Sequence, residues 1–143
     1  MSPSPLDLAW VPVNFERMSA PQGQIILVAD DNADQRALYV DLLTYNGFRV
    51  VEARDGVEAI DLARAERPAL ILMDVTMPGT SGWNAVRALR EQVETSTIPI
   101  IVITGLAQTR DRDASFAAGS DAYLSKPVAP RQLLEEVRRF LPA

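Results

Sequence analysis

Apolar and polar residues come in regular blocks along most of the chain, and the blocks predict alternating strands and helices. Five short runs rich in apolar residues predict strands, at 24–29, 48–53, 69–74, 99–104 and 121–125. Five longer segments predict helices, at 33–46, 55–67, 81–93, 109–118 and 130–141. Strand and helix therefore alternate from residue 24 to residue 141.

The apolar spacing also predicts which side of several helices faces inward. The first helix has Leu38, Leu42 and Tyr45 at helical spacing, and the third has Val86, Leu89 and Val93. In the last helix the residues expected to face inward are Leu133, Leu134, Val137 and Phe140.

Several residues predict where helices begin and end. Gly47 and Gly119 are placed to stop two of the helices. Asp55 and Glu58 resemble a capping box at the start of the second helix, and Pro68 follows its end. Pro130 stands in the first turn of the last helix, where its missing amide hydrogen does no harm.

The most apolar strands are continuous runs rather than alternations of apolar and polar residues. That pattern is typical of a parallel sheet with helices on both faces, because both faces of each strand are then buried. We therefore predict an α/β fold with a doubly wound, five-stranded parallel sheet. In such sheets ligands bind at the carboxyl ends of the strands, at a topological switch point.

Residues 1–23 differ from the rest of the chain. They contain four of the ten prolines, and we interpret them as an irregular N-terminal extension before a domain at 24–143. A floppy tail is one interpretation. The apolar residues Trp10, Val11, Val13 and Phe15 leave open that the segment packs on the domain or on a second copy.

Composition narrows the possible chemistry. The chain has 143 residues, enough for one ordinary domain, and a net charge of −5, which argues against broad contact with nucleic acid or anionic membrane. It has neither cysteine nor histidine, so a bound metal would be a hard cation held by oxygen atoms. No apolar run reaches the roughly 18 residues of a membrane span, and no signal peptide is evident, so we expect a cytoplasmic protein.

Polar residues stand at the carboxyl ends of the predicted strands. Asp30 and Asp31 end the first strand, Asp74 the third and Thr104 the fourth, and Lys126 follows the fifth. Singly, each has an ordinary explanation as a helix cap, a turn residue or a surface charge. In a parallel sheet, however, they share one edge, where three carboxylates would repel one another by several kcal/mol unless a cation compensated them.

Lys126 strengthens this interpretation, because it is the only lysine in the chain and the other basic residues are arginines. Lysine contributes a compact point charge suited to a phosphate group. A carboxylate, a Mg²⁺ site, a hydroxyl and a lysine at one point predict a phosphoryl-transfer site, with Asp74 as the nucleophile that forms an acyl phosphate.

The segment from about 24 to 141 resembles the receiver domain of two-component response regulators, in particular single-domain, chemotaxis-regulator-like receivers. The matching motifs are "LVADD" (27–31), "LMDVTMPGTSG" (72–82), "VITG" (102–105) and "DAYLSKP" (121–127). Each motif alone is weak, but together, in this order, they cover nearly the whole domain. The resemblance implies a flavodoxin-like (βα)5 fold.

The resemblance also implies a role for each site residue. Asp74 corresponds to the phosphoacceptor. Asp30 and Asp31 correspond to the acidic pair that holds Mg²⁺ (or Mn²⁺) together with Asp74, and the backbone carbonyl of Thr76 is a further ligand. The switch hydroxyl, the phosphate-binding lysine and the aromatic switch residue correspond to Thr104, Lys126 and Tyr123. The Lys126–Pro127 bond is expected to be cis.

For Tyr123, ordinary packing of a strand aromatic on a helix is the alternative. Leu106, two residues after Thr104, is apolar and cannot orient a water molecule, so we expect no strong help with autodephosphorylation.

The absence of histidine means that the phosphoryl group must come from elsewhere. The expected donor is a histidine kinase, a histidine phosphotransfer protein or a small phosphodonor. Phosphorylation would shift the population between two conformations, read by a protein partner at the fourth helix, last strand and last helix, near residues 107 to 139. The protein is expected to be a monomer or a phosphorylation-dependent dimer, with no direct contact with nucleic acid or membrane.

We expect no enzymatic activity beyond Mg²⁺-dependent phosphorylation and dephosphorylation of the protein itself. Only Pro142 and Ala143 follow the last predicted helix, so a stand-alone receiver is favoured over a domain excised from a longer protein.

Three alternatives remain at this point. A flavodoxin-like cofactor binder is disfavoured because "ADDNADQ" would repel a phosphate. A Mg²⁺-dependent phosphatase acting through an aspartyl phosphate is disfavoured because Thr76 occupies the place of its second acid. The third is a receiver-fold interaction module regulated without phosphorylation.

Overall fold

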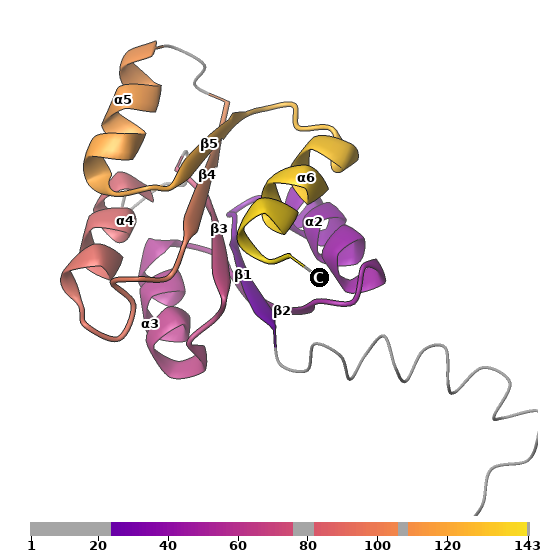
Figure 1. The fold of residues 1–143 in the computed structure, drawn as a ribbon, viewed down its shortest axis with the longest axis horizontal. Coiled ribbons are helices and arrows are strands. Elements are labelled where there is room, and N and C mark those ends of the chain that lie inside the picture. The colour runs from indigo at the N-terminus through magenta and orange to yellow at the C-terminus, as the bar shows by residue number, and fades with distance from the viewer. Residues whose placement is uncertain (1–23, 76–81, 106–108, 143) are drawn as a thin grey trace, which may run out of the picture.

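Five short strands form one parallel sheet in the computed structural model, which describes residues 24–75, 82–105 and 109–142. The strands are β1 (Ile25–Ala29), β2 (Arg49–Ala53), β3 (Leu70–Asp74), β4 (Ile100–Thr104) and β5 (Ala122–Ser125). Their order in the sheet is β2-β1-β3-β4-β5, as Figure 1 shows. After β2 the chain returns to the other side of β1, so the winding direction reverses between β1 and β3. That reversal is the switch point at which the site was predicted.

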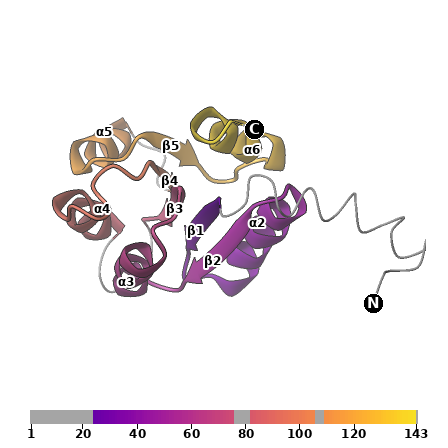
Figure 2. The ribbon, with the colours of Figure 1, turned by 60° about the horizontal axis from the view of Figure 1, so that its bottom comes forward.

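Helices cover both faces of the sheet. They are α2 (Ala33–Tyr45), α3 (Gly56–Glu66), α4 (Gly82–Glu91), α5 (Thr109–Ala118) and α6 (Pro130–Phe140). Helices α2 and α6 lie on one face and α3, α4 and α5 on the other, which both views show (Figures 1 and 2). The predicted doubly wound α/β fold is confirmed. None of these helices, within the described part of the chain, has the length and apolar character needed to span a bilayer.

Each face of the sheet has its own apolar core, because successive strand residues point to opposite sides. Along β1, Leu27 and Ala29 belong to the core under α3, α4 and α5. Ile26 and Val28 belong to the core under α2 and α6. Strands β3 and β4 are buried at every position. This burial on both faces explains why their sequences are continuous apolar runs.

Two of the predicted inward faces are wrong in part. In α2 the buried residues are Tyr39 and Leu43, whereas Leu38 and Tyr45 are 68% and 78% exposed. The helix has apolar residues on two sides, so spacing alone could not identify the side that packs on the sheet. The third predicted helix corresponds to α4, which ends at Glu91. Val93 therefore lies beyond the helix, and it is 87% exposed. The last helix agrees with the prediction, since Leu133 and Val137 are buried.

The capping box and the two glycines predicted at helix ends are confirmed. The Asp55 side chain accepts a hydrogen bond from the Glu58 amide at 2.8 Å, and the Glu58 carboxylate accepts one from the Arg54 amide at 2.7 Å. Gly47 and Gly119, which follow α2 and α5, have φ angles of 94° and 116°. These positive angles favour glycine over residues with a Cβ atom.

A close contact at Gly82 gives a prediction about stability. A Cβ atom at this position would clash with the Cα atom of Val75, so Gly82→Ala would force α4 away from the end of β3. We expect a loss of about 1–3 kcal/mol in the free energy of unfolding, as for other overpacked sites, measured by urea denaturation. Gly105→Ala is the control, because none of the described residues lies within 4 Å of its added Cβ atom. Equal stabilities of the two variants would contradict the prediction.

Candidate functional site

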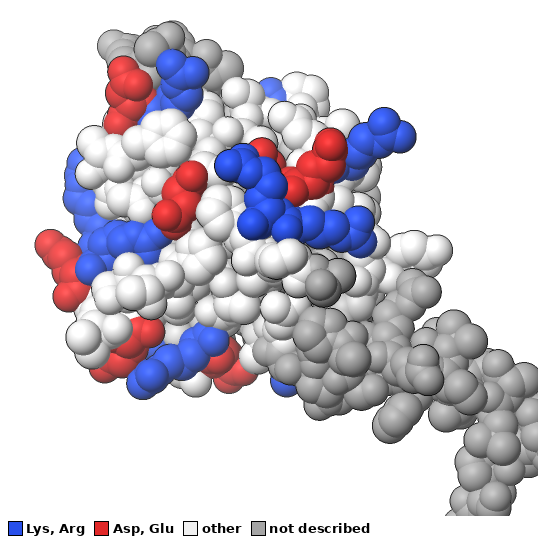
Figure 3. Space-filling model, viewed as in Figure 1, with Lys and Arg blue, Asp and Glu red and all other residues white. Residues whose placement is uncertain are grey.

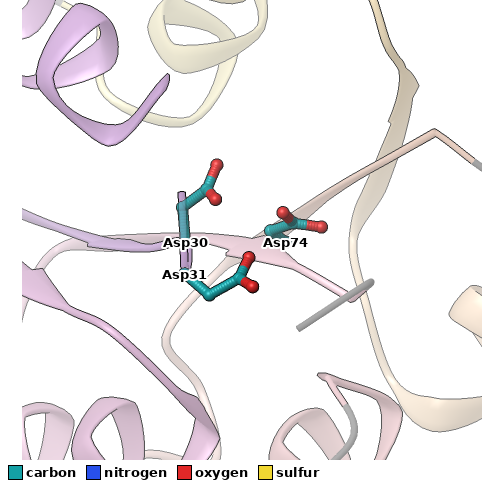
Figure 4. A group of neighbouring side chains, drawn as sticks. All are labelled: Asp30, Asp31 and Asp74. Carbon is teal, nitrogen blue, oxygen red and sulfur yellow. The ribbon is translucent and has the colours of Figure 1, made fainter. Parts of the chain in front are cut away.

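Three carboxylates meet where β1 and β3 end side by side. The two strands pair in parallel, with Ala29 opposite Met73, so that Asp30, Asp31 and Asp74 leave the sheet at the same edge. One oxygen atom from each of the three side chains lies within 4.8 Å of the other two. Figure 4 shows this group at the ends of its two strands. The fold therefore brings together the acidic residues that the sequence predicted as one site.

Asp30 is held in a buried position at this edge. Its side chain is 1% exposed, and its Oδ1 accepts a hydrogen bond from the Asn32 amide at 2.9 Å. Its Oδ2 atom is buried, and no described residue donates a hydrogen bond to it. Burial raises the pKa of Asp30 from 3.8 to about 6, and the negative charge of Asp74 adds to this effect, while the Asn32 hydrogen bond and Lys126 oppose it.

The same environment affects Tyr39, which lies on the inner side of α2. Its pKa is raised from 10.0 to about 12, first by burial and then by the negative charges of Asp30 and Asp74.

Asp74 and Lys126 form a partly buried ion pair. The Asp74 side chain is 3% exposed, and its Oδ2 accepts a hydrogen bond from Lys126 Nζ at 2.8 Å. Lys126 reaches the site from the end of β5, two strands away, and its amide donates to the Thr104 carbonyl at 2.8 Å. The Lys126–Pro127 peptide bond is cis, as the resemblance implied.

Thr104 and Tyr123 lie on neighbouring strands. Thr104 ends β4 and is fully buried, and it is paired in register with Ser125 of β5. Tyr123 pairs with Val102 and packs, half-buried, against the core under α3, α4 and α5. Because side chains two residues apart share a face of a strand, Thr104 and Tyr123 belong to the same face of the sheet. This packing of the tyrosine ring is compatible with a role as the aromatic switch residue and also with ordinary packing of a strand aromatic on a helix.

Of the predicted site residues, Asp30, Asp31, Asp74, Thr104 and Lys126 all lie at the carboxyl edge of the sheet, and Tyr123 lies on the strand beside Thr104. Thr76 and Leu106 lie outside the described residues.

Two further residues contact the site but were not predicted. Gln35 Oε1 accepts a hydrogen bond from Lys126 Nζ at 2.7 Å, and Arg36 Nη1 donates to the Asp30 carbonyl at 2.6 Å. Arg36 also forms an ion pair with Glu52 of β2 at 2.9 Å. In the sequence, Gln35 is marked only by its spacing of three residues after the helix-capping Asn32. That spacing is typical of a capping box, in which the glutamine side chain bonds to the backbone and not to Lys126.

The oxygen atoms at this edge fit a hard divalent cation. Mg²⁺ binds oxygen ligands and typically uses one or two carboxylates together with water and phosphate oxygens. The buried Asp30 Oδ2 without a hydrogen-bond donor, beside two further carboxylates, is the arrangement that such a cation would stabilise. The acidic group is therefore compatible with Mg²⁺.

Comparisons with known proteins agree with this geometry. The family model described as "Response regulator receiver domain" matches residues 26–138. The polar-differentiation response regulator DivK of Brucella anthropi is 34% identical over 116 residues, which cover 81% of this chain and 94% of DivK. DivK of Brucella ovis has the same identity and coverage.

Solved structures show the same fold. The chemotaxis protein CheY4 of Vibrio cholerae matches with a TM-score of 0.78 and 31% identity, over 81% of this chain and 97% of CheY4. The receiver domain of the Pseudomonas aeruginosa sensor histidine kinase PA1611, with a magnesium ion in its active-site cleft, matches with a TM-score of 0.78 and 33% identity, over 85% of this chain and all (100%) of that domain. The family match and the shared flavodoxin-like (βα)5 fold show that this chain belongs to the response regulator receiver domains of two-component signalling.

Proposed function

We propose that Asp74 accepts a phosphoryl group from a phosphohistidine donor and that the phosphorylated protein controls a protein partner. The observation that carries this proposal is the position of the Asp74 carboxylate, which is 3% exposed, 2.8 Å from the Lys126 ammonium and beside Asp30 and Asp31. A buried carboxylate held between a cation and an acidic metal site is suited to nucleophilic attack on phosphorus.

In the proposed step an Asp74 carboxylate oxygen forms a bond to phosphorus while the P–N bond of the donor phosphohistidine breaks. The leaving imidazole nitrogen takes the electron pair, and the product is an acyl phosphate. Lys126 compensates negative charge on the transferred group, since its ammonium already lies at the carboxylate. None of the 143 residues is a histidine, so the proposed donor lies outside this sequence: a histidine kinase, a histidine phosphotransfer protein or a small phosphodonor.

Asp30, Asp31 and Asp74 would hold Mg²⁺ or Mn²⁺, with the Thr76 carbonyl as the proposed fourth ligand. When bound, the ion would neutralise negative charge on the phosphoryl oxygens and on the three carboxylates. The magnesium ion in the PA1611 receiver domain supports this assignment.

Thr104 and Tyr123 form the proposed switch. A hydroxyl at the end of β4 can donate to a phosphoryl oxygen on Asp74, because β3 and β4 are neighbours and Asp74 and Thr104 are the last residues of these strands at the same edge of the sheet. Tyr123 lies on the same face of the adjacent strand, so a movement of Thr104 would change the space available to the ring. The phosphoryl group would thereby favour one of two conformations.

The proposed output surface lies over α5, β5 and α6. On α6, the exposed Arg131, Arg138 and Arg139 alternate with acidic residues, and Arg139 forms an ion pair with Glu136 at 2.9 Å. Figure 3 shows basic and acidic side chains interspersed over α6 rather than a region of one sign. Such a surface suits a protein partner better than nucleic acid. In this proposal residues 24–143 form the receiver domain, and residues 1–23 form a separate extension.

Phosphorylation by a small donor tests the proposal. The protein is incubated with phosphoramidate or acetyl phosphate, with Mg²⁺ or with EDTA, and its intact mass is measured. We expect a gain of one phosphoryl group that requires Mg²⁺, because the metal compensates the three carboxylates. Failure to gain mass, together with failure to bind beryllofluoride, would contradict the proposal and favour a receiver regulated without phosphorylation. Steady release of phosphate with rapid turnover would favour a phosphatase.

A further inference from the structure

We infer that Gln35 is a positioning residue for Lys126: its side-chain amide holds the ammonium at the site when Asp74 becomes phosphorylated. The inference rests on the proposed function. It starts from the two hydrogen bonds of Lys126 Nζ, 2.8 Å to Asp74 Oδ2 and 2.7 Å to Gln35 Oε1.

The two partners of the ammonium differ in what happens to them during the reaction. The attacking oxygen of Asp74 becomes the bridging oxygen of an acyl phosphate and the negative charge moves to the phosphoryl oxygens, so the contact of Asp74 with Lys126 must change. The Gln35 amide is neutral and takes no part in bond formation, so its contact can persist. A lysine side chain has a flexible stem of four carbons, and a second anchor reduces the entropy that it loses when it binds a phosphoryl oxygen.

Gln35 is itself placed by the first turn of α2. Its amide nitrogen donates to Asn32 Oδ1 at 2.9 Å, which fixes the start of the helix next to Asp30 and Asp31. Arg36, one residue later, is 13% exposed at its side chain and bonds both the Asp30 carbonyl and Glu52. The turn is therefore tied to the strand that supplies the acidic pair, and Gln35 connects this strand to the lysine that follows β5.

Gln35→Met tests the inference, because methionine has a similar length but cannot accept the hydrogen bond in this way. We expect the rate constant for phosphorylation by phosphoramidate to fall about ten- to a hundredfold, the usual effect of losing one hydrogen bond to a charged group. Gln132→Met is the matched control: it makes the same substitution at an exposed position of α6, and its rate should stay within about twofold of wild type. An unchanged rate for Gln35→Met would overturn the inference.

Two further measurements separate positioning of the lysine from a general distortion of α2. The Mg²⁺ affinity of Gln35→Met should equal that of wild type, because Gln35 contacts the lysine and not the acidic pair; a parallel loss of Mg²⁺ affinity would overturn the inference. In metal-free protein, the stabilities of Gln35→Met, Lys126→Met and the double variant should be non-additive, and simple additivity would also overturn it. If wild type itself gains no phosphoryl group, the proposed function fails instead.

Discussion

Asp74→Ala is expected to abolish phosphorylation by small donors, with a loss of more than roughly a thousandfold in rate, because the substitution removes the attacking oxygen. Asp74 is the carboxylate that contacts the Lys126 ammonium, at 2.8 Å, and one of its oxygen atoms lies within 4.8 Å of oxygen atoms of Asp30 and Asp31. Intact mass after incubation with phosphoramidate and Mg²⁺ gives the result directly. The variant should show no phosphoryl adduct under conditions in which the wild type is fully modified.

The control for this experiment is Asp61→Ala, which removes an exposed aspartate of α3. It should be phosphorylated like the wild type. Asp74→Asn keeps the shape of the side chain and a hydrogen-bond acceptor for Lys126, so it tests whether any loss comes from altered folding rather than from the missing nucleophile. A Mg²⁺-dependent adduct on either Asp74 variant would show that another residue is the acceptor.

Asp30→Asn is expected to stabilise the metal-free protein at neutral pH. The pKa of Asp30 is raised from 3.8 to about 6 by burial and by Asp74, so its charged form is disfavoured in the folded state. This rise in the pKa lowers the free energy of unfolding at neutral pH by about 3 kcal/mol, because a tenfold change in proton affinity is worth about 1.36 kcal/mol. Asparagine keeps the oxygen that accepts the Asn32 hydrogen bond but carries no charge.

The sign of the pH dependence follows from the raised pKa. The folded state binds the Asp30 proton more tightly than the unfolded state, so protonation of Asp30 stabilises the folded wild type. This stabilisation is fully present below about pH 4. It is lost as the pH rises through about 6. Urea denaturation in EDTA should therefore show the Asn variant more stable above pH 6, with the difference shrinking toward pH 4.

Saturating Mg²⁺ should reduce the difference in stability between Asp30→Asn and wild type at neutral pH. The ion binds the folded wild type and offsets the repulsion among its three carboxylates. Asp61→Asn, at an exposed position, should show neither effect. A difference between Asp30→Asn and wild type that did not depend on pH would contradict the assigned environment of Asp30.

The predicted elements and the predicted edge of the sheet agree closely with the structure. The strands were identifiable because burial on both faces makes β3 and β4 apolar at nearly every position. The site residues were identifiable because Asp74, Thr104 and Lys126 are polar residues at or just after the ends of such strands. Side chains on a surface helix are less determined: the apolar Leu38 and Tyr45 are exposed, and Tyr39 and Leu43 pack on the sheet instead.

By itself, the sequence determined the fold class, the approximate bounds of the elements and the chemistry of the site, because these depend on periodicity and on residue types that mark strand ends. Only the tertiary structure decided which groups touch. It placed Lys126 between Asp74 and Gln35, the latter 91 positions away along the chain, and left Asp30 Oδ2 buried without a donor among the described residues. The physical reason is that contacts and desolvation depend on distances across the sheet, and neither residue type nor local spacing in the sequence specifies those distances.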